Sequence, residues 1–197
     1  TGVGSEVITL TGQGSVGTAN AANNKLVTQN TLSLVSASGN ASNYTMGTIR
    51  LNVTPRTVNV ALKKVYDGTL DAPASGLKVN GISNTVGGQT LALSGTGIMQ
   101  DKNAGIAKNL VNNNSLTLLD GSGLALNYTL SGGVHTVDVT PRSTEASGSR
   151  FYDGTTTVRG NIFNSFTNTV GSDTLTLSGS GTINSSNVGS KTVNIGS

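Results

Sequence analysis

The sequence predicts an all-β protein built from tandem antiparallel β-sandwich units of about 85 residues. Three observations lead to this fold class. Gly (27), Ser (23), Thr (28) and Asn (22) make up 100 of the 197 residues, and all four are poor residues for a helix interior. Apolar and polar residues alternate in short runs, as in half-buried strands. Short motifs recur at spacings of 83 to 86 residues, which is the size of one small domain.

The alternating runs are separated by Gly and Asn at roughly the 8–12-residue intervals that are typical of sandwiches and barrels. In chain order they are Ile49–Val53, Val58–Leu62, Leu91–Leu93, Leu116–Leu118, Val137–Val139, Leu175–Leu177 and Val193–Ile195. We expect an immunoglobulin-like arrangement, with a β-grasp unit or a right-handed β-helix as the alternatives. A β-helix needs a repeat near 20 residues, and the sequence has none.

Composition and charge exclude several classes of function. The chain has no Cys, 11% charged residues and a net charge of +3, which excludes Cys-ligated metal sites and disulfides. Its only adjacent basic pair is Lys63-Lys64, so we expect no nucleic-acid partner. No apolar run reaches the roughly 18–20 residues of a membrane helix, and we expect no membrane insertion. The first residues lack a signal-peptide pattern, so we expect an internal fragment of a longer protein.

The repeated motifs occur in a fixed order. The matched segments are Gln89–Gly97 with Asp173–Gly181 and, more weakly, with Glu6–Gly14, Tyr66–Thr69 with Tyr152–Thr155, Asn43–Thr45 with Asn127–Thr129, and Val53–Arg56 with Val139–Arg142. Counted from the Tyr-Asp-Gly motif, residues 57–142 are a complete repeat, residues 1–56 are the C-terminal part of one, and residues 143–197 are the N-terminal part of another.

Proline marks the expected boundaries between units. Pro55 and Pro141 cannot donate to a β-ladder, so the Thr-Pro-Arg segments predict domain junctions. Only a few residues separate the strands on either side, which predicts stiff coupling of neighbouring units. One alternative is a permuted unit, running from Val3 to about Asn84 and then from Thr85 to about Asn168, in which Tyr66 would pack on the strand at Ile8–Leu10. Another is that the partial end units borrow strands from a neighbouring chain.

Four segments carry a resemblance to a known family. They are Lys64–Thr69, Asp101–Gly105, Asn127–Leu130 and Val139–Arg142. In this order they resemble the YDG repeat and the related Gly-rich MBG repeat, which occur in large bacterial surface proteins of the filamentous-haemagglutinin type exported by two-partner secretion. The likeness covers essentially the whole chain. It departs at Thr18–Ala21, which replaces Asp-Lys-Asn-Ala-Gly, and at Arg150-Phe151, which replaces Lys-Val, so we expect that the Lys64 position is not essential.

The resemblance implies an extracellular protein of the bacterial cell surface. It implies that these repeats are the stalk or spacer of a secreted adhesin that mediates cell-surface or biofilm attachment. The implied partners are neighbouring repeats of the same chain and, through other regions, host or matrix glycans. A carbohydrate-binding module is the alternative, and a large groove lined by two or more exposed tyrosines would favour it.

The motif residues are interpreted as structural. They are Tyr66, Asp67, Gly68, Tyr152, Asp153, Gly154, Asn43, Tyr44, Asn127, Tyr128, Pro55 and Pro141. In the Tyr-Asp-Gly motif, Gly supplies a positive φ, Asp bonds the local backbone, and the Tyr ring closes the end of a core with few aromatics. The tyrosines of the two Asn-Tyr motifs have the same role, and their Asn residues should turn the chain and bond the backbone. The functional alternative is an aromatic platform for a sugar.

We expect no catalytic, metal or cofactor site, and no enzymatic activity. The only histidine, His135, lies near no nucleophile motif, so we expect it at the surface or at a strand edge. The acidic residues lack the spacing of a calcium loop. In the complete unit Leu91, Leu93, Val137, Val139 and Tyr128 should be buried. We expect Leu175, Leu177 and Tyr152 in matching positions of the third.

Overall fold

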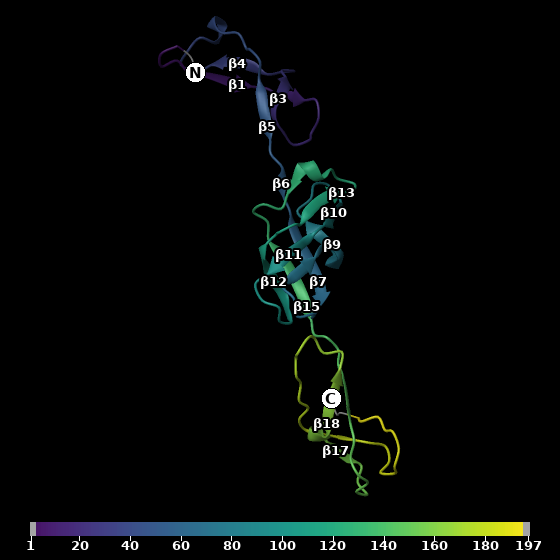
Figure 1. The fold of residues 1–197 in the computed structure, drawn as a ribbon. Coiled ribbons are helices and arrows are strands. Elements are labelled where there is room, and N and C mark those ends of the chain that lie inside the picture. The colour runs from purple at the N-terminus through teal and green to yellow at the C-terminus, as the bar shows by residue number, and fades with distance from the viewer. Residues whose placement is uncertain (1–2, 195–197) are drawn as a thin grey trace.

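The structure is a computed structural model that describes residues 3–194, and it shows three lobes in a line (Figure 1). Among these residues, every strand pairing lies within one of the ranges 8–53, 56–140 and 145–194. Pro55 and Pro141 lie between these ranges. The described chain is all-β: it has strands, four single-turn 3-10 helices and no α-helix.

The central lobe is built on a curled, six-stranded sheet that forms a half-barrel, with strand order β8-β11-β12-β15-β7-β9. Its strands are β6 (Arg56–Thr57), β7 (Asn59–Val65), β8 (Asp71–Pro73), β9 (Leu77–Ser83), β10 (Leu91–Ser94), β11 (Thr96–Met99), β12 (Gly105–Asn112), β13 (Thr117–Asp120), β14 (Tyr128–Thr129) and β15 (His135–Thr140). β10 and β13 form a separate antiparallel pair, and η2 (Ala74–Gly76) and η3 (Ala125–Asn127) are its 3-10 turns.

The core of the central lobe follows the alternation in β7 and β15. These two strands pair in parallel, with Val60 opposite His135 and Leu62 opposite Val137. All four side chains are buried, and Met99 of β11 packs into the same core. The intervening residues face outward, so each strand presents one apolar face.

The predicted core of this lobe is confirmed at four of five positions. Leu91, Val137, Val139 and Tyr128 are buried, while Leu93 is partly buried and packs at the edge of the core.

The N-terminal lobe repeats the second half of this pattern. Its elements are β1 (Ile8–Thr11), β2 (Ser15–Val16), β3 (Ala22–Thr28), β4 (Ser33–Ser36), η1 (Ala41–Asn43) and β5 (Arg50–Val53). The sheet β2-β3-β5 corresponds to β11-β12-β15, and the pair β1-β4 corresponds to β10-β13. Leu10 and Leu51 remain 51% and 49% exposed.

The C-terminal lobe repeats the first half of the pattern. It consists of β16 (Glu145–Gly148), β17 (Thr157–Arg159), η4 (Gly160–Ile162), β18 (Phe163–Thr167) and β19 (Ser180–Thr182). The pair β16-β18 corresponds to β7-β9, and β17-β19 corresponds to β8-β11.

The expectation that Leu175, Leu177 and Tyr152 are buried in the third unit is wrong, because they are 44%, 36% and 66% exposed. In the central lobe β15 lies against β7 and packs over the matching core. The described part of this lobe has no strand in that place. The run at Val193–Ile195 ends outside the described residues.

The all-β prediction is confirmed, but the immunoglobulin-like sandwich is not. One long strand pair of the central lobe, β7 with β15, is parallel, whereas a wholly antiparallel unit was expected. The other pairs of the six-stranded sheet are antiparallel.

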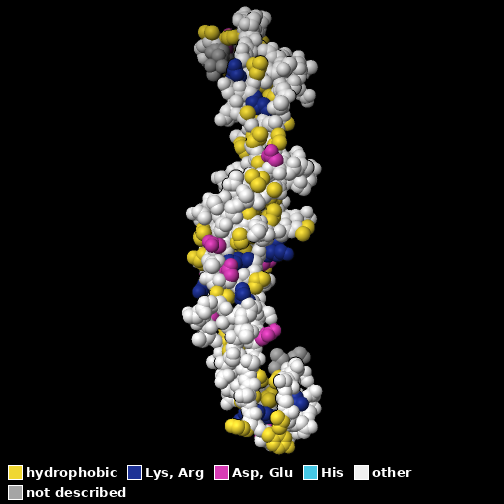
Figure 2. All heavy atoms as spheres, turned by 45° about the vertical axis from the view of Figure 1, so that its right-hand side comes forward, with side chains coloured by type: hydrophobic (Ala, Val, Ile, Leu, Met, Phe, Trp, Pro, Cys, Tyr) yellow, Lys and Arg dark blue, Asp and Glu magenta, His cyan; other side chains and the backbone are white. Residues whose placement is uncertain are grey.

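Uncharged polar side chains and backbone dominate the surface of the rod, with charged groups and apolar side chains scattered along it (Figure 2).

Candidate functional site: repeat motifs at the lobe junctions

The two Tyr-Asp-Gly motifs form the same turn. Asp67 Oδ1 accepts hydrogen bonds from the Thr69 backbone N (3.0 Å) and Thr69 Oγ1 (2.8 Å). Gly68 between them has a φ of +78°, a conformation that glycine adopts without strain. Asp153 and Thr155 repeat the geometry with two bonds of 2.9 Å. The predicted backbone roles of Asp and Gly are therefore confirmed in both copies.

A buried cation fixes the first turn. Lys64 Nζ lies 2.7 Å from Asp67 Oδ1 and donates to Thr69 Oγ1 (2.9 Å) and to the Asp71 carbonyl (2.6 Å). The side chain of Lys64 is only 7% exposed. Desolvation works to raise the pKa of Asp67, but the bonds from Lys64 and Thr69 outweigh it and lower the pKa from 3.8 to about 2.

Arg150 takes the place of Lys64 in the second turn, and it contacts the matching acceptors. Its guanidinium donates to Asp153 Oδ2 (2.9 Å), to the Thr155 carbonyl (2.6 Å) and to the Thr157 carbonyl (2.7 Å). A hydrogen bond from the Thr155 backbone is the main cause that lowers the pKa of Asp153. In each copy the cation at this position contacts at least three acceptors, Lys64 in the first turn and Arg150 in the second.

The first Tyr-Asp-Gly turn also contacts the next lobe. The Tyr66 ring packs against the core of the central lobe, and its hydroxyl donates to Asp173 Oδ2 of the C-terminal lobe (3.0 Å). This bond raises the pKa of Tyr66. A Cβ on Gly68 would lie 2.7 Å from Val170 Cγ1, so the turn touches two residues of that lobe. Tyr66 and Leu93 both pack against the core cluster of the central lobe.

The tyrosine of the Asn-Tyr motif ties two loops together inside its own lobe. The Tyr128 hydroxyl donates to Gln89 Oε1 (2.5 Å) and accepts from the Val86 backbone N (3.1 Å). Tyr44 repeats this in the N-terminal lobe: its hydroxyl donates to Glu6 and accepts from the Val3 backbone N (2.8 Å). The bond to Glu6 raises the pKa of Tyr44.

The asparagines of these motifs have different surroundings. Asn127 contacts the N-terminal lobe, because its Oδ1 accepts from the Ala21 backbone N (2.7 Å) and its Nδ2 donates to Asn20 Oδ1 (3.0 Å). The backbone that it bonds therefore belongs to the neighbouring unit. Asn43 ends the 3-10 turn η1, where its backbone N donates to the Asn40 carbonyl (3.1 Å).

An arginine–asparagine clasp follows each junction proline. Arg56 donates to the Asn84 carbonyl and to Asn84 Oδ1, both at 2.7 Å. Arg142 Nε donates to the Asn168 carbonyl (2.9 Å) and to Asn168 Oδ1 (3.0 Å), and Arg142 Nη2 donates to the same Oδ1 (2.6 Å). Each asparagine returns a 2.7 Å bond from Nδ2 to a nearby carbonyl, of Thr57 and of Ser143 respectively.

The sequence shows these two asparagines at the start of a repeated Asn-Thr-Val-Gly motif, but sequence reasoning assigned them no role. Asn84 and Asn168 have φ values of +69° and +61°, which Asn tolerates better than most residues. The signal was present, because Arg56 to Asn84 spans 28 residues and Arg142 to Asn168 spans 26 within the same motif order. Both clasps fix the direction in which the chain enters a lobe.

The predicted surface position of His135 is wrong. The residue is 7% exposed, because it shares the inward parity of Val137 and Val139 in β15. Its Nε2 is 2.8 Å from the Leu130 carbonyl, while Nδ1 is buried without a hydrogen-bond partner in the described structure.

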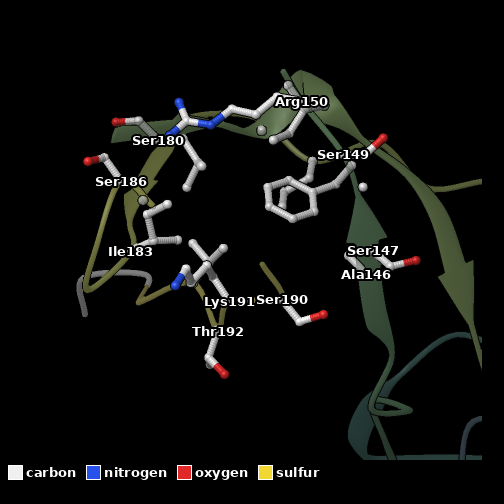
Figure 3. Close-up of a pocket in the computed structure, with 18 of the residues that line it drawn as sticks. Ala146, Ser147, Ser149, Arg150, Ser180, Ile183, Ser186, Ser190, Lys191 and Thr192 are labelled. Carbon is white, nitrogen blue, oxygen red and sulfur yellow. The ribbon is translucent and has the colours of Figure 1, made fainter. Parts of the chain in front are cut away.

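A groove of about 920 Å³ opens in the C-terminal lobe between β16 and β19. Figure 3 shows Ile183 and Ala146 on opposite walls. Phe151 and Tyr152 lie at the groove and are 96% and 66% exposed. Tyr152 is the single tyrosine that lines it, so the groove lacks the pair of exposed tyrosines that a sugar platform would favour.

Within residues 3–194, no three His, Asp or Glu side chains gather as a metal site. None of the helices in that range is long and apolar enough to cross a bilayer.

Comparison with known families identifies the repeat. The model of the YDG domain matches residues 48–136 and again residues 135–197. Together these matches cover most of the chain, and the protein therefore belongs to the YDG domain family. No curated protein matches the chain, and no solved structure matches it either. The first family match begins near β5 and the second begins at β15, and each of these strands precedes a Thr-Pro-Arg segment. The family unit therefore starts one strand earlier than the lobe that the strand pairings define.

Proposed function

We propose that this chain is a stretch of the stalk of a secreted bacterial surface adhesin, in which YDG units act as stiff spacers. The observation that carries the proposal is the junction. Each Pro is followed by the same Arg–Asn clasp, and the Tyr66 turn bonds the next lobe. A spacer needs units that are held in line more than it needs a ligand pocket, and repeated junction contacts serve that need.

The lobe contacts support stiffness on both sides of the central lobe. Asn127 bonds Asn20 and Ala21 of the lobe before it, and Tyr66 bonds Asp173 of the lobe after it. With linkers of only a few residues, these polar contacts limit bending at both junctions.

We also keep the immunoglobulin-like sandwich as a prediction, with the six-stranded sheet and the β10-β13 pair as its two layers.

The function is tested in the longer surface protein. Removing the segment that corresponds to residues 57–142 should shorten the reach of the protein from the cell surface. Attachment should then fall when a bulky capsule covers the cell and stay unchanged on bare cells. Loss of attachment on bare cells would contradict a spacer role.

A carbohydrate-binding module is the second candidate. The groove lacks a second tyrosine, but Phe151 and Tyr152 together offer two exposed aromatic rings on which a sugar can stack. Titration of the chain with host and biofilm glycans distinguishes the two. Saturable binding that is lost in both Phe151→Ala and Tyr152→Ala would support the module. A spacer alone should show no saturable binding.

A further inference from the structure

The central lobe has two insertions relative to the N-terminal lobe. The first lies between η3 and β15. Asn43 and Asn127 are 84 residues apart, whereas Val53 and Val139 are 86 residues apart. The segment before β15 is therefore two residues longer in the central lobe, and it contains the Ser-Gly-Gly run at positions 131–133.

The second insertion lies at the end of β12. Lys25 and Lys108 are counterparts, because each bonds the carbonyls five and seven residues before it, and they are 83 residues apart. Asn30 and Asn114, which both have a φ of +45°, are 84 residues apart. The central lobe therefore carries one additional residue in this stretch.

Two polar residues also replace apolar residues of the N-terminal lobe. The pairing of β3 with β5 has the same register as the pairing of β12 with β15. This register matches Asn109 with Leu26 and, one step further along the ladder, His135 with Ile49. An amide and an imidazole therefore stand in the central lobe where the first lobe has two aliphatic side chains.

Both insertions and both replacements surround one cavity of about 570 Å³. It is lined by Asn109–Asn113 from the end of β12, by Leu130, and by Gly132–His135 from the segment that leads into β15. A spacer role requires no such departure from one unit to the next. The grouping of four differences around one cavity points to a ligand of the central lobe.

The lining of this cavity is polar but uncharged. Asn109, Asn112 and Asn113 contribute amides, Leu110 and Leu130 contribute apolar surface, and none of the described lining residues is Lys, Arg, Asp or Glu. The Asn114 backbone N donates to Asn112 Oδ1 (2.7 Å), which fixes the direction of that amide. Amides both donate and accept hydrogen bonds, so the lining matches a neutral ligand with several hydroxyl groups.

His135 supplies an unpartnered acceptor beside the cavity. The Leu130 carbonyl can only accept, so the Nε2 atom that lies 2.8 Å from it carries a proton. In the neutral ring Nδ1 is then an acceptor, and it is buried without a hydrogen-bond partner in the described structure. A buried acceptor without a donor is costly, and a ligand hydroxyl would supply the donor.

The inserted segment covers the ring of His135. A Cβ on Gly133 would lie 2.8 Å from His135 Cε1, the carbon bonded to Nδ1, so a glycine permits this close approach. Gly132 has a φ of +76°, and no described atom lies within 4 Å of the position of its Cβ. The segment therefore has room to shift and to open Nδ1 to the cavity.

We propose that this cavity binds a neutral sugar residue. One sugar hydroxyl donates to His135 Nδ1, the asparagine amides bond neighbouring hydroxyls, and Leu110 and Leu130 contact the apolar face of the ring. The site lies in a different lobe from the groove beside Phe151 and Tyr152. The spacer proposal does not depend on it, because a spacer functions with or without this ligand.

Titration of the whole chain with neutral monosaccharides, and with oligosaccharides of the same sugars, tests the site by NMR. Saturable shifts are expected at the Asn112 and Gly133 amides and at the Nδ1 resonance of His135, where a new hydrogen bond forms. Tighter binding of the oligosaccharides would identify a polysaccharide as the source, and equal affinity a free sugar. If no sugar causes saturable shifts at these residues, the proposal is overturned.

Two variants install residues of the first lobe at the cavity. His135→Ile and Asn109→Leu should each weaken sugar binding by about tenfold or more, because each removes a hydrogen-bonding group. Ala107→Asn is the matched control: it installs the first lobe's Asn24 outside the cavity, at a φ that is positive in both lobes (+52° and +60°). Its affinity should stay within about twofold of the unsubstituted chain.

Two results with these variants would refute the proposal. One is the same affinity in all three variants. The other is binding that persists in His135→Ile and is lost in Phe151→Ala, which would assign the sugar to the groove of the C-terminal lobe.

Discussion

Replacing Tyr128 by Phe tests the role assigned to the Asn-Tyr motif. The ring is 6% exposed, and Phe retains its packing. The substitution removes the donor to Gln89 Oε1 and the acceptor for the Val86 backbone N. Loss of two such bonds near the edge of a core should lower the free energy of unfolding of the central lobe by about 1–3 kcal/mol.

Replacing Tyr128 by Ala adds the loss of the ring. A buried tyrosine ring hides roughly 150–200 Å², and at about 25 cal/mol per Å² this is worth about 4–5 kcal/mol. Large aromatic truncations cost about 3–5 kcal/mol, so Tyr128→Ala should fall in that range. The control is Tyr152→Phe, since Tyr152 is 66% exposed, and it should change stability by less than about 0.5 kcal/mol.

The assay must report the central lobe alone, because three lobes need not unfold together. Native-state hydrogen exchange of amides in β7 and β15 meets this condition. A loss below about 1 kcal/mol for Tyr128→Ala would refute the structural role and revive the sugar-platform interpretation.

Two further predictions concern the Tyr-Asp-Gly turn. In thermal unfolding, Gly68→Ala should lower the stability more than Gly132→Ala does. Both glycines have a positive φ (+78° and +76°), but only at position 68 would the new Cβ press against Val170. Equal losses of stability would contradict the junction contact. The turn should also weaken in acid, because the pKa of Asp67 is about 2 in the folded chain and 3.8 ordinarily. The stabilisation that ionised Asp67 gives to the turn is complete above about pH 4 and is lost as the pH falls towards 2. Chemical shifts of the Thr69 amide should change in that range, and a midpoint near 3.8 would refute the ion pair.

The sequence was most informative where a local pattern determines the structure. Alternation in β7 and β15 placed Val137 and Val139 in the core, and the Asp-Gly spacing identified the turn at Asp67 and Gly68. Both depend on residues that are near neighbours in the chain. The family resemblance also came from the order of these local motifs.

The parallel pairing of β7 with β15 was not predictable from alternation, because the two strands are separated by most of a repeat and alternation is the same in parallel and antiparallel pairs. His135 was misplaced for a different reason. Its inward parity is visible in the sequence, but a lone histidine that has no copy in the other repeat carries no local signal that distinguishes a core position from a surface one. Arg150 differs from Lys64 in residue type, and the feature that the two positions share is the positive charge.

The central claim is that the junctions hold neighbouring lobes in a fixed orientation. The distance distribution between spin labels at Lys102→Cys in the central lobe and Ser165→Cys in the C-terminal lobe measures this directly, because the chain has no other cysteine. The account predicts one narrow distribution that broadens when Arg142→Ala removes the clasp to Asn168 or Tyr66→Phe removes the bond to Asp173. A broad distribution in the unsubstituted junction, unchanged by either substitution, would contradict it.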